Sequence, residues 1–213
     1  LVADYSDGGD VIIARNDIKT LSQLKGKKVG ADTTSLPIFI LARALAVHGL
    51  RLSDVQIVPL DQGEMELAYT RGELDAAVTY PPVSVRLQAR NDSSAIFTSK
   101  EIPGEIIDVV SVENTVLKER PDDIEKIKQA WQMALDYAEK EPASAYRIMA
   151  NREGITPEEF KAALGDLKIV SMQDQEKFKG TLKVTLNNVK DVLVTTGVLS
   201  KDTTADCCVP GVK

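Results

Sequence analysis

The sequence predicts an α/β protein with mainly parallel sheets, and three observations lead to this fold class. Short, continuously apolar segments alternate with helical segments up to about residue 100, a pattern typical of parallel strands that are covered on both faces. The apolar segments end in polar loops. From Pro121 onward the sequence is almost entirely helical. We therefore expect a sheet-rich part and a helix-rich part.

The chain opens with a glycine-rich turn that precedes the apolar run at residues 11–14. Paired glycines permit positive φ angles and a close approach of the backbone, which suits either a tight turn or a small molecule lying against the main chain. Both interpretations stay open from the residues alone. A short helical turn at residues 18–25 then leads to a second strand at residues 28–31. The turn itself consists of Ser6, Asp7, Gly8, Gly9 and Asp10.

A hydroxyl-rich corner follows the second strand and organises this part of the chain. Thr33, Thr34 and Ser35 stand in a row before an amphipathic helix that ends at Gly49. The N-terminus of a helix presents unpaired N–H groups and the positive end of its dipole, so it favours anions and carbonyl oxygens. Ser and Thr also cap helices without any ligand. The corner is therefore a candidate binding site with an ordinary capping role as the alternative.

The next strands also end in polar loops. We expect strands at residues 55–60, 74–78 and 95–98, and helices at residues 64–71 and 82–90. The carboxyl ends of parallel strands meet at one edge of a sheet, where ligands of α/β proteins bind. The sequence therefore predicts that loops 33–35, 61–63 and 79–82 converge on one site.

The remainder is predicted to be helical around two short strands. A strand at residues 106–112 and another at residues 168–172 accompany helices at 122–140, 142–151 and 174–196, with a further helix capped by Thr156. We expect Trp131 to lie in the core.

Composition excludes several classes of protein. The net charge of −6 and the pI near 5.0 argue against a nucleic-acid partner. No run approaches the roughly 18 apolar residues of a membrane span. Cys207 and Cys208 are neighbours near the end of the chain, too close for an unstrained disulfide and too few for a zinc site, so we expect them to be inert. We predict no metal and no cofactor.

Several motifs resemble, in order, those of the periplasmic solute-binding proteins of ABC importers, in particular the nitrate, sulfonate and taurine family that also includes binders of thiamine precursors. The similar segments are SDGGD, LKGKKVG, TTSLPIFI, GLRLSDVQIV, GELDAAVTYPP and PGEIIDVV. The resemblance implies a two-lobed, periplasmic-binding-protein-like fold of type II. Lobe one would comprise residues 1–12 and 108–213, lobe two residues 13–107, and hinge strands would lie near residues 10–15 and 106–112.

The same resemblance implies a site and a function. The chain would bind a small solute, an organic anion such as a sulfonate or a related small molecule, between the lobes and deliver it to a membrane permease of an ABC importer. It would be periplasmic, or extracellular and anchored to a bacterial membrane. The ligand-facing residues would be Ser6, Asp7, Gly8, Gly9, Asp10, Thr33, Thr34, Ser35, Asp75, Thr79, Tyr80 and Glu105.

One departure from the family matters, and two alternative functions stay open. Its members begin with a segment that builds half of lobe one, and this sequence starts after it, so we expect an incomplete lobe one whose apolar faces are covered by a preceding segment or by self-association. The alternatives are a ligand-sensing domain of a membrane receptor and a thiamine-pyrimidine synthase of the same fold. We predict no enzymatic activity, because His48 is the single histidine and Cys207 with Cys208 does not reproduce the synthases' cysteine motif.

Overall fold

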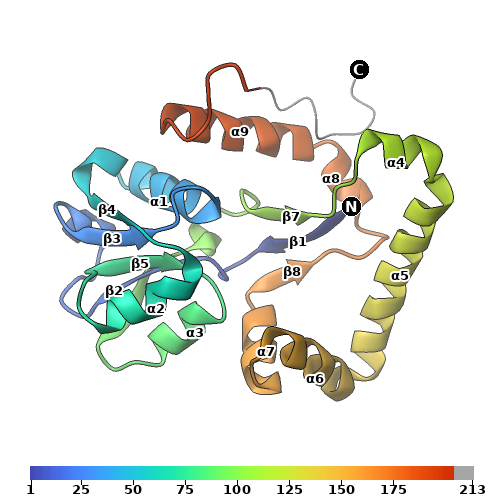
Figure 1. The fold of residues 1–213 in the computed structure, drawn as a ribbon, viewed down its shortest axis with the longest axis horizontal. Coiled ribbons are helices and arrows are strands. Elements are labelled where there is room, and N and C mark those ends of the chain that lie inside the picture. Colours follow the sequence, from blue (N-terminus) through green and yellow to red (C-terminus); the bar gives the residue numbers. More distant parts are fainter. Residues whose placement is uncertain (204–213) are drawn as a thin grey trace.

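The computed structural model describes residues 1–203, apart from the side chain of Lys179. Figure 1 shows a compact α/β body built on one sheet, a ring of helices at the opposite end, and a second, small sheet between them. Cys207 and Cys208, which we expected to be inert, lie outside the described residues.

Eight strands form two sheets within the described residues. They are β1 (Val2–Ser6), β2 (Val11–Arg15), β3 (Lys28–Ala31), β4 (Gln56–Pro59), β5 (Ala76–Thr79), β6 (Ser93–Thr98), β7 (Ile107–Val109) and β8 (Leu167–Ile169).

The α-helices surround these sheets. They are α1 (Leu36–Val47), α2 (Gln62–Thr70), α3 (Val83–Gln88), α4 (Asn114–Glu119), α5 (Pro121–Lys140), α6 (Pro142–Glu153), α7 (Pro157–Leu164), α8 (Glu176–Lys179) and α9 (Leu182–Thr195). Short 3₁₀ turns occur at Leu21–Leu24, Leu52–Asp54 and Ser99–Glu101.

The five-stranded sheet has the order β4-β3-β5-β2-β6. Strand β3 runs parallel to β4 and β5, whereas β2 runs antiparallel to both β5 and β6. The α/β prediction is confirmed, but the expectation of mainly parallel sheets is wrong. The reason is that β2 enters this sheet from the other one and pairs with strands far from it in sequence, which an apolar pattern does not reveal.

The three-stranded sheet, β7-β1-β8, is antiparallel throughout. Strand β1 was not among the predicted strands. Its residues alternate between buried and half-buried, but the buried positions include Asp4 and Ser6. Polar residues on the inner face hide the period of two that identifies a strand in sequence.

Two apolar clusters make the core, and both belong to the five-stranded sheet. One face packs against α1, where Phe39, Leu41 and Leu45 are buried. The other face packs against α2 and α3 around Tyr69 and Leu87. Helix α1 is apolar almost all round, which is typical of a helix buried between layers.

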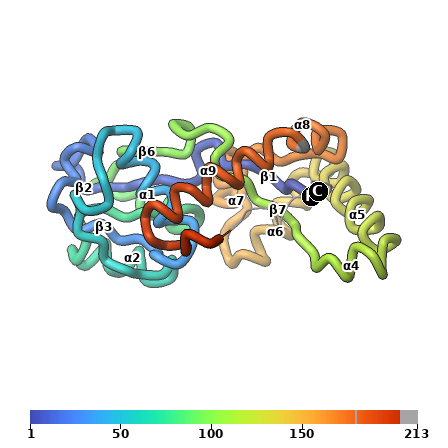
Figure 2. Tube along the Cα trace, turned by 90° about the horizontal axis from the view of Figure 1, so that it is seen from above, coloured from blue at the N-terminus to red at the C-terminus, as the bar shows by residue number. Residues whose placement is uncertain are grey.

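Helix α9 links the two ends of the molecule. Tyr5 of β1 contacts Phe178 of α8, with ring centroids 6.0 Å apart. From there α9 runs across the top of the molecule and its far end packs against the α1 side of the core through Val189, Val192 and Leu193. Figures 1 and 2 agree in placing α9 beside α1.

Several element boundaries differ from the predictions. Helix α4 was not predicted, and the single helix expected at residues 174–196 is broken into α8 and α9. Helix α5 contains no buried residue, so Trp131, expected in the core, is half-buried and donates a hydrogen bond from Nε1 to the carbonyl of Val170 at 2.9 Å. Within residues 1–203, no helix combines the length and the apolar character needed to cross a membrane.

Candidate functional site

The loops that follow β4 and β5 are joined by hydrogen bonds. The Thr79 hydroxyl donates to the side-chain oxygen of Gln62 at 2.9 Å, and the Gln62 amide donates to the carbonyl oxygen of Tyr80 at 2.8 Å. Asp61 caps α2 by accepting from the Glu64 N–H at 3.0 Å. Thr79 is fully buried, whereas Tyr80 is 38% exposed. Two of the three predicted loops therefore meet, and the side chains of Asp61 and Tyr80 are exposed on them.

The third loop is closed on itself by Asp32. One Asp32 carboxylate oxygen accepts from the Thr34 N–H at 2.8 Å and from the Thr34 hydroxyl at 2.7 Å, and the other accepts from the Ser35 hydroxyl at 2.6 Å. These bonds lower the pKa of Asp32, the Ser35 bond most. The hydroxyls of Thr34 and Ser35 thus stabilise the turn in this state, in line with the structural alternative considered for this corner.

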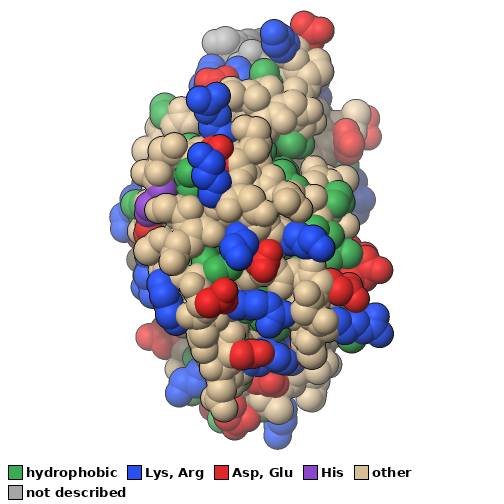
Figure 3. Space-filling view, turned by 90° about the vertical axis from the view of Figure 1, so that its left-hand side faces the viewer, with side chains coloured by type: hydrophobic (Ala, Val, Ile, Leu, Met, Phe, Trp, Pro, Cys, Tyr) green, Lys and Arg blue, Asp and Glu red, His purple; other side chains and the backbone are tan. Residues whose placement is uncertain are grey.

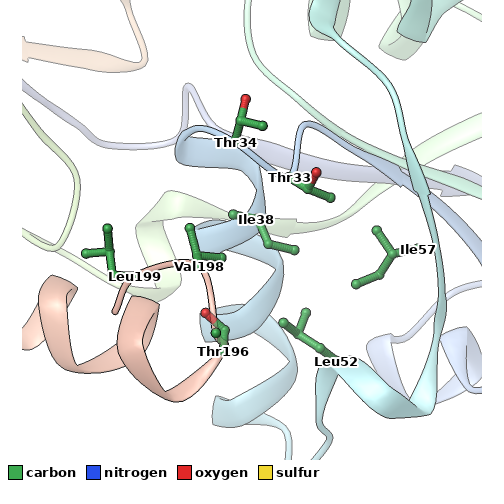
Figure 4. A pocket seen from close by; sticks show the side chains of 9 residues that line it. Thr33, Thr34, Ile38, Leu52, Ile57, Thr196, Val198 and Leu199 are labelled. Carbon is green, nitrogen blue, oxygen red and sulfur yellow. The ribbon is translucent and has the colours of Figure 1, made fainter. Parts of the chain in front are cut away.

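A hollow of about 570 Å³ opens beside the same corner (Figure 4). Its walls come from α1, the Leu52–Asp54 turn, β4 and the turn after α9. In Figure 4 the hydroxyl oxygens of Thr33 and Thr34 point away from Ile38 and Leu52, so the lining is mostly apolar. The lining residues are Thr33, Thr34, Ile38, Leu52, Ile57, Thr196, Gly197, Val198 and Leu199.

Two segments, residues 7–10 and 99–106, connect the two sheets and are hydrogen-bonded to each other. The hydroxyls of Ser6 and Ser99 lie 2.8 Å apart, and the Gly8 N–H donates to the Ser99 hydroxyl at 2.7 Å. The Ser99 N–H in turn donates to the carbonyl of Asp10 at 2.9 Å, and the Ser6 N–H donates to that of Ile106 at 3.0 Å. Residues 7–10 and 99–106 therefore cross as one hydrogen-bonded unit.

The glycine-rich turn packs against the segment that enters β8. Gly8 has a φ of +123°, and a Cβ there would lie 2.9 Å from Asp166 Oδ1. The Asp7 N–H donates to the Asp166 carbonyl at 2.8 Å, and the Asp7 carboxylate lies 3.2 Å from Lys168 Nζ. A Cβ on Gly9 would lie 3.3 Å from the Leu167 side chain. The paired glycines thus allow a close approach of the protein to itself.

Two buried carboxyl groups border this turn. Asp4 is 9% exposed and Asp10 is 6% exposed. Burial is the main cause that raises the pKa of each to about 6, and the negative charge of Asp108 adds to it for both. Burial also raises the pKa of Tyr80, with a further contribution from the charges of Asp32 and Asp10. The loop ends and the crossing therefore share one electrostatic environment, which is acidic.

The carboxylates of two predicted site residues are held by other parts of the fold. Asp75 precedes β5, at the end opposite Thr79, where its carboxylate accepts from the Lys28 N–H at 2.8 Å. Glu105 is held by both donors of Arg43 on α1, at 2.6 and 2.7 Å. Both carboxylates thus serve contacts within the fold, and their place at the ligand site stays a prediction.

Sequence reasoning missed three residues that shape this region. Asp4 lay in an unpredicted strand, and Asp32 and Ser99 stood inside expected elements or loops without a motif of their own. For Asp32 the available signal was position, because it directly follows the end of β3. In the part of the chain that the structure describes, no cluster of three or more His, Cys, Asp or Glu side chains is arranged to hold a metal ion.

Comparisons with known proteins agree with this architecture. A Brucella abortus protein named as a binding protein is 26% identical over 212 residues, which is 93% of this chain and 64% of that protein. The chain thus spans about two thirds of the length of such relatives. An aliphatic sulfonates-binding protein of Escherichia coli is 34% identical over 73 residues, covering 34% of this chain and 23% of that protein.

Solved structures show the same fold. The periplasmic aliphatic sulphonate binding protein SsuA of Escherichia coli has a TM-score of 0.75 and 16% identity, covering 94% of this chain and 68% of its own. The desulfurization enzyme DSZB has a TM-score of 0.67 and 14% identity, covering 94% of this chain and 72% of its own. The fold is therefore that of sulfonate-binding proteins and is shared by an enzyme.

A family model described as NMT1/THI5 like matches residues 8–145, well over half of the chain. That stretch contains the whole five-stranded sheet, residues 8–10 and 99–106 of the crossing, and all of α5. The chain belongs to the NMT1/THI5-like family.

Proposed function

We propose that this chain forms the main part of a solute-binding protein that closes on a small molecule and delivers it to an ABC-type permease. The observation that carries the proposal is the convergence of the loops after β4 and β5 with the crossing at residues 7–10 and 99–106. Ligands of open α/β sheets bind beyond the carboxyl ends of the strands. The similarity to sulfonate-binding proteins supports the same role.

The mechanism that we propose is hinge closure. A ligand that contacts both parts stabilises the closed state and shifts its population. The division into residues 1–12 with 108–213 and residues 13–107 is the one we propose for the two moving parts, with the crossing as the hinge. Micromolar affinity corresponds to roughly 8 kcal/mol, so several contacts from both parts must contribute.

The outer face of the five-stranded part is a candidate surface for the permease. Figure 3 shows Lys, Arg, Asp and Glu side chains mixed over this face, with apolar side chains scattered between them. Mixed charge of this kind suits a transient complex, in which electrostatic complementarity sets the rate of encounter more than the affinity. Periplasmic localisation belongs to the same proposal, by analogy with the SsuA proteins.

The alternatives are a receptor domain that senses the same ligand and an enzyme. The enzyme alternative is considered because the desulfurization enzyme DSZB has the same fold. His48, the single histidine, lies at the end of α1 with Nδ1 3.1 Å from the Ala44 carbonyl and Nε2 3.8 Å from Glu101. These contacts give it a role at the helix end, which supports binding over catalysis.

The test is a thermal-shift panel on the full-length protein with sulfonates, taurine, nitrate, pyrimidines and amines. A ligand at 100 times its Kd raises stability by about 2.7 kcal/mol. The variant Tyr80→Ala should weaken binding of any hit, whereas Tyr137→Ala should not, because Tyr137 lies on α5 although its exposure of 43% is close to the 38% of Tyr80. No stabilisation by any class would contradict the proposal, as would equal binding by the two variants.

A further inference from the structure

Helix α9 begins near one end of the molecule and ends on the other. By its place in the sequence it belongs to the part that contains residues 108–213, yet its second half lies over α1 of the five-stranded part (Figures 1 and 2). A segment that connects two moving parts must follow one of them when they move. The contacts at its two ends identify the part that α9 follows.

Helix α8, which precedes α9, is fixed to the three-stranded sheet. The Val2 N–H donates to the side-chain oxygen of Gln175 at 2.9 Å, and the Gln175 amide donates to the Val2 carbonyl at 2.8 Å. The ring of Phe178 packs against that of Tyr5 in the same strand, with centroids 6.0 Å apart. Two hydrogen bonds and a ring contact with β1 therefore hold α8 in place.

The second half of α9 is fixed to the five-stranded part by apolar packing. Val189, Val192 and Leu193 pack against the buried cluster that includes the inner face of α1. After the helix the chain folds back, since the N–H groups of Val198 and Leu199 donate to the Leu193 carbonyl at 2.9 and 3.0 Å. Val198 then packs against the same cluster. Among the described helices, α1 is the one with which α9 has the most extensive contact.

The stretch between these two anchors is loosely packed. Gly180 separates the two helices, and a Cβ placed there would meet no atom within 4 Å. Val184, in the first turn of α9, is 59% exposed. Glycine lowers helix propensity relative to alanine because its backbone is freer. The chain can therefore change direction at residues 180–181 at little cost in packing.

We propose that α9 is a strap that moves with the five-stranded part, and that residues 180–181 form a third hinge point beside the connections at residues 7–10 and 99–106. The inference rests on the proposed hinge closure and deepens it, because it transfers residues 182–199 from one moving part to the other. A helix of 14 residues is a stiff rod of about 21 Å. The strap therefore restricts the closing motion to rotations about its joint.

The experiment measures three distances by pulsed electron paramagnetic resonance on the full-length protein. Spin labels are attached in pairs at exposed positions of α1, α5 and α9, in a chain whose native cysteines are replaced. Each pair is measured alone and with ethanesulfonate, taurine, nitrate or cytosine. We expect the α1–α9 distance to stay constant while the α5–α9 and α1–α5 distances change together. The substitutions are Ala46→Cys, Gln129→Cys, Asn188→Cys, Cys207→Ser and Cys208→Ser.

Three variants test the anchor and the joint. Leu193→Ala removes apolar contact with the α1 side of the core, so the α1–α9 distance distribution should broaden even without solute. Val184→Ala, on an exposed residue of the same helix, is the matched control and should leave the distribution unchanged. Gly180→Ala stiffens the joint and should reduce the change that a solute causes in the α1–α5 distance. Leu193 is only half-buried, so its variant should still fold, which thermal melting checks.

The outcomes separate the strap from the proposed function. A constant α5–α9 distance with a changing α1–α9 distance would overturn the strap and leave hinge closure in place. A constant α1–α5 distance with every probe would count against hinge closure, and the measurements without solute then decide the strap. Equal α1–α9 distributions in Leu193→Ala and Val184→Ala would overturn it. An unchanged response of Gly180→Ala to solute would overturn the assignment of the joint.

Discussion

The two ends of this molecule differ sharply in how well they cover their apolar surface. Residues 11–106 contain nearly all of the buried apolar side chains, whereas the rest of the described chain contributes Val2, Ala145, Ala150 and Val170. Helix α5 has no buried residue, and Ile127, Met133 and Tyr137 are exposed along it. The five-stranded part thus has a core of its own, while the helical part presents apolar surface that monomers seldom leave uncovered.

The largest expected effect contrasts a buried with an exposed apolar residue. Phe39→Ala should destabilise the protein by about 3–5 kcal/mol, because Phe39 is 2% exposed between α1 and the sheet. Met133→Ala, at a residue 70% exposed, should change stability by less than about 0.5 kcal/mol. Urea unfolding measures both, and similar losses would show that the helical part has a packed core in solution.

The second prediction concerns the acidic crossing between the two parts. In the folded protein the pKa of Asp10 is raised from 3.8 to about 6, so the folded state holds more protons than the unfolded state between these values. Stability therefore falls as pH rises from about 4 to about 6. Asp10→Asn removes this penalty and should stabilise the protein by about 1–3 kcal/mol at pH 8, with little gain at pH 4.

Denaturant unfolding at several pH values tests this prediction. Asp4→Asn should behave in the same direction, since the pKa of Asp4 is raised to about 6 by burial and by Asp108. Asp17→Asn, on an exposed side chain, is the control. The assignment would be refuted if the substitution raised the free energy of unfolding no more at pH 8 than at pH 4.

A third prediction addresses the exposed apolar residues of α5. The 213-residue chain should self-associate with rising concentration, and the double change Ile127→Lys and Met133→Lys should shift it toward monomer with little effect on unfolding. Val47→Lys, at a residue 46% exposed on α1, is the corresponding change on the five-stranded part and should leave self-association unaltered. Sedimentation velocity measures this, and a monomer at every concentration would contradict it.

The smallest effect is expected at the hydroxyl corner. Ser35 precedes α1 without capping it, and its hydroxyl donates to Asp32 instead. Ser35→Ala should therefore cost only about 0.5 kcal/mol, the low end for a residue at this position. A loss near 2 kcal/mol in thermal unfolding would mean that the Asp32 turn holds α1 in place.

The five-stranded part was easier to predict from the sequence than the helical part. Its strands and helices lie close to the predicted ranges, because apolar residues in β2, β3 and β5 are continuous and α1 to α3 are bounded by glycines, prolines or caps. The direction of β2 was not predictable, since it depends on pairing with strands that follow it by more than 60 residues.

The helical end and the site were less predictable for related reasons. Asp4 and Ser6 face inward in β1 and so concealed that strand. The convergence of residues 61–63 with Thr79 and Tyr80 followed from the rule for strand ends, but the roles of Asp75 and Glu105 depend on Lys28 and Arg43, distant partners that only the fold identifies. Local patterns locate elements, and buried polar contacts require the structure.

The most direct test of the account is hydrogen exchange on the full-length protein with and without a ligand found in the panel. We expect protection of residues 4–10, 61–63, 79–82 and 99–106, because the solute is proposed to bind where the loop ends meet the crossing. Protection confined to residues 52–57 and 196–199, beside the hollow next to α9, would place the ligand elsewhere and contradict the central claim.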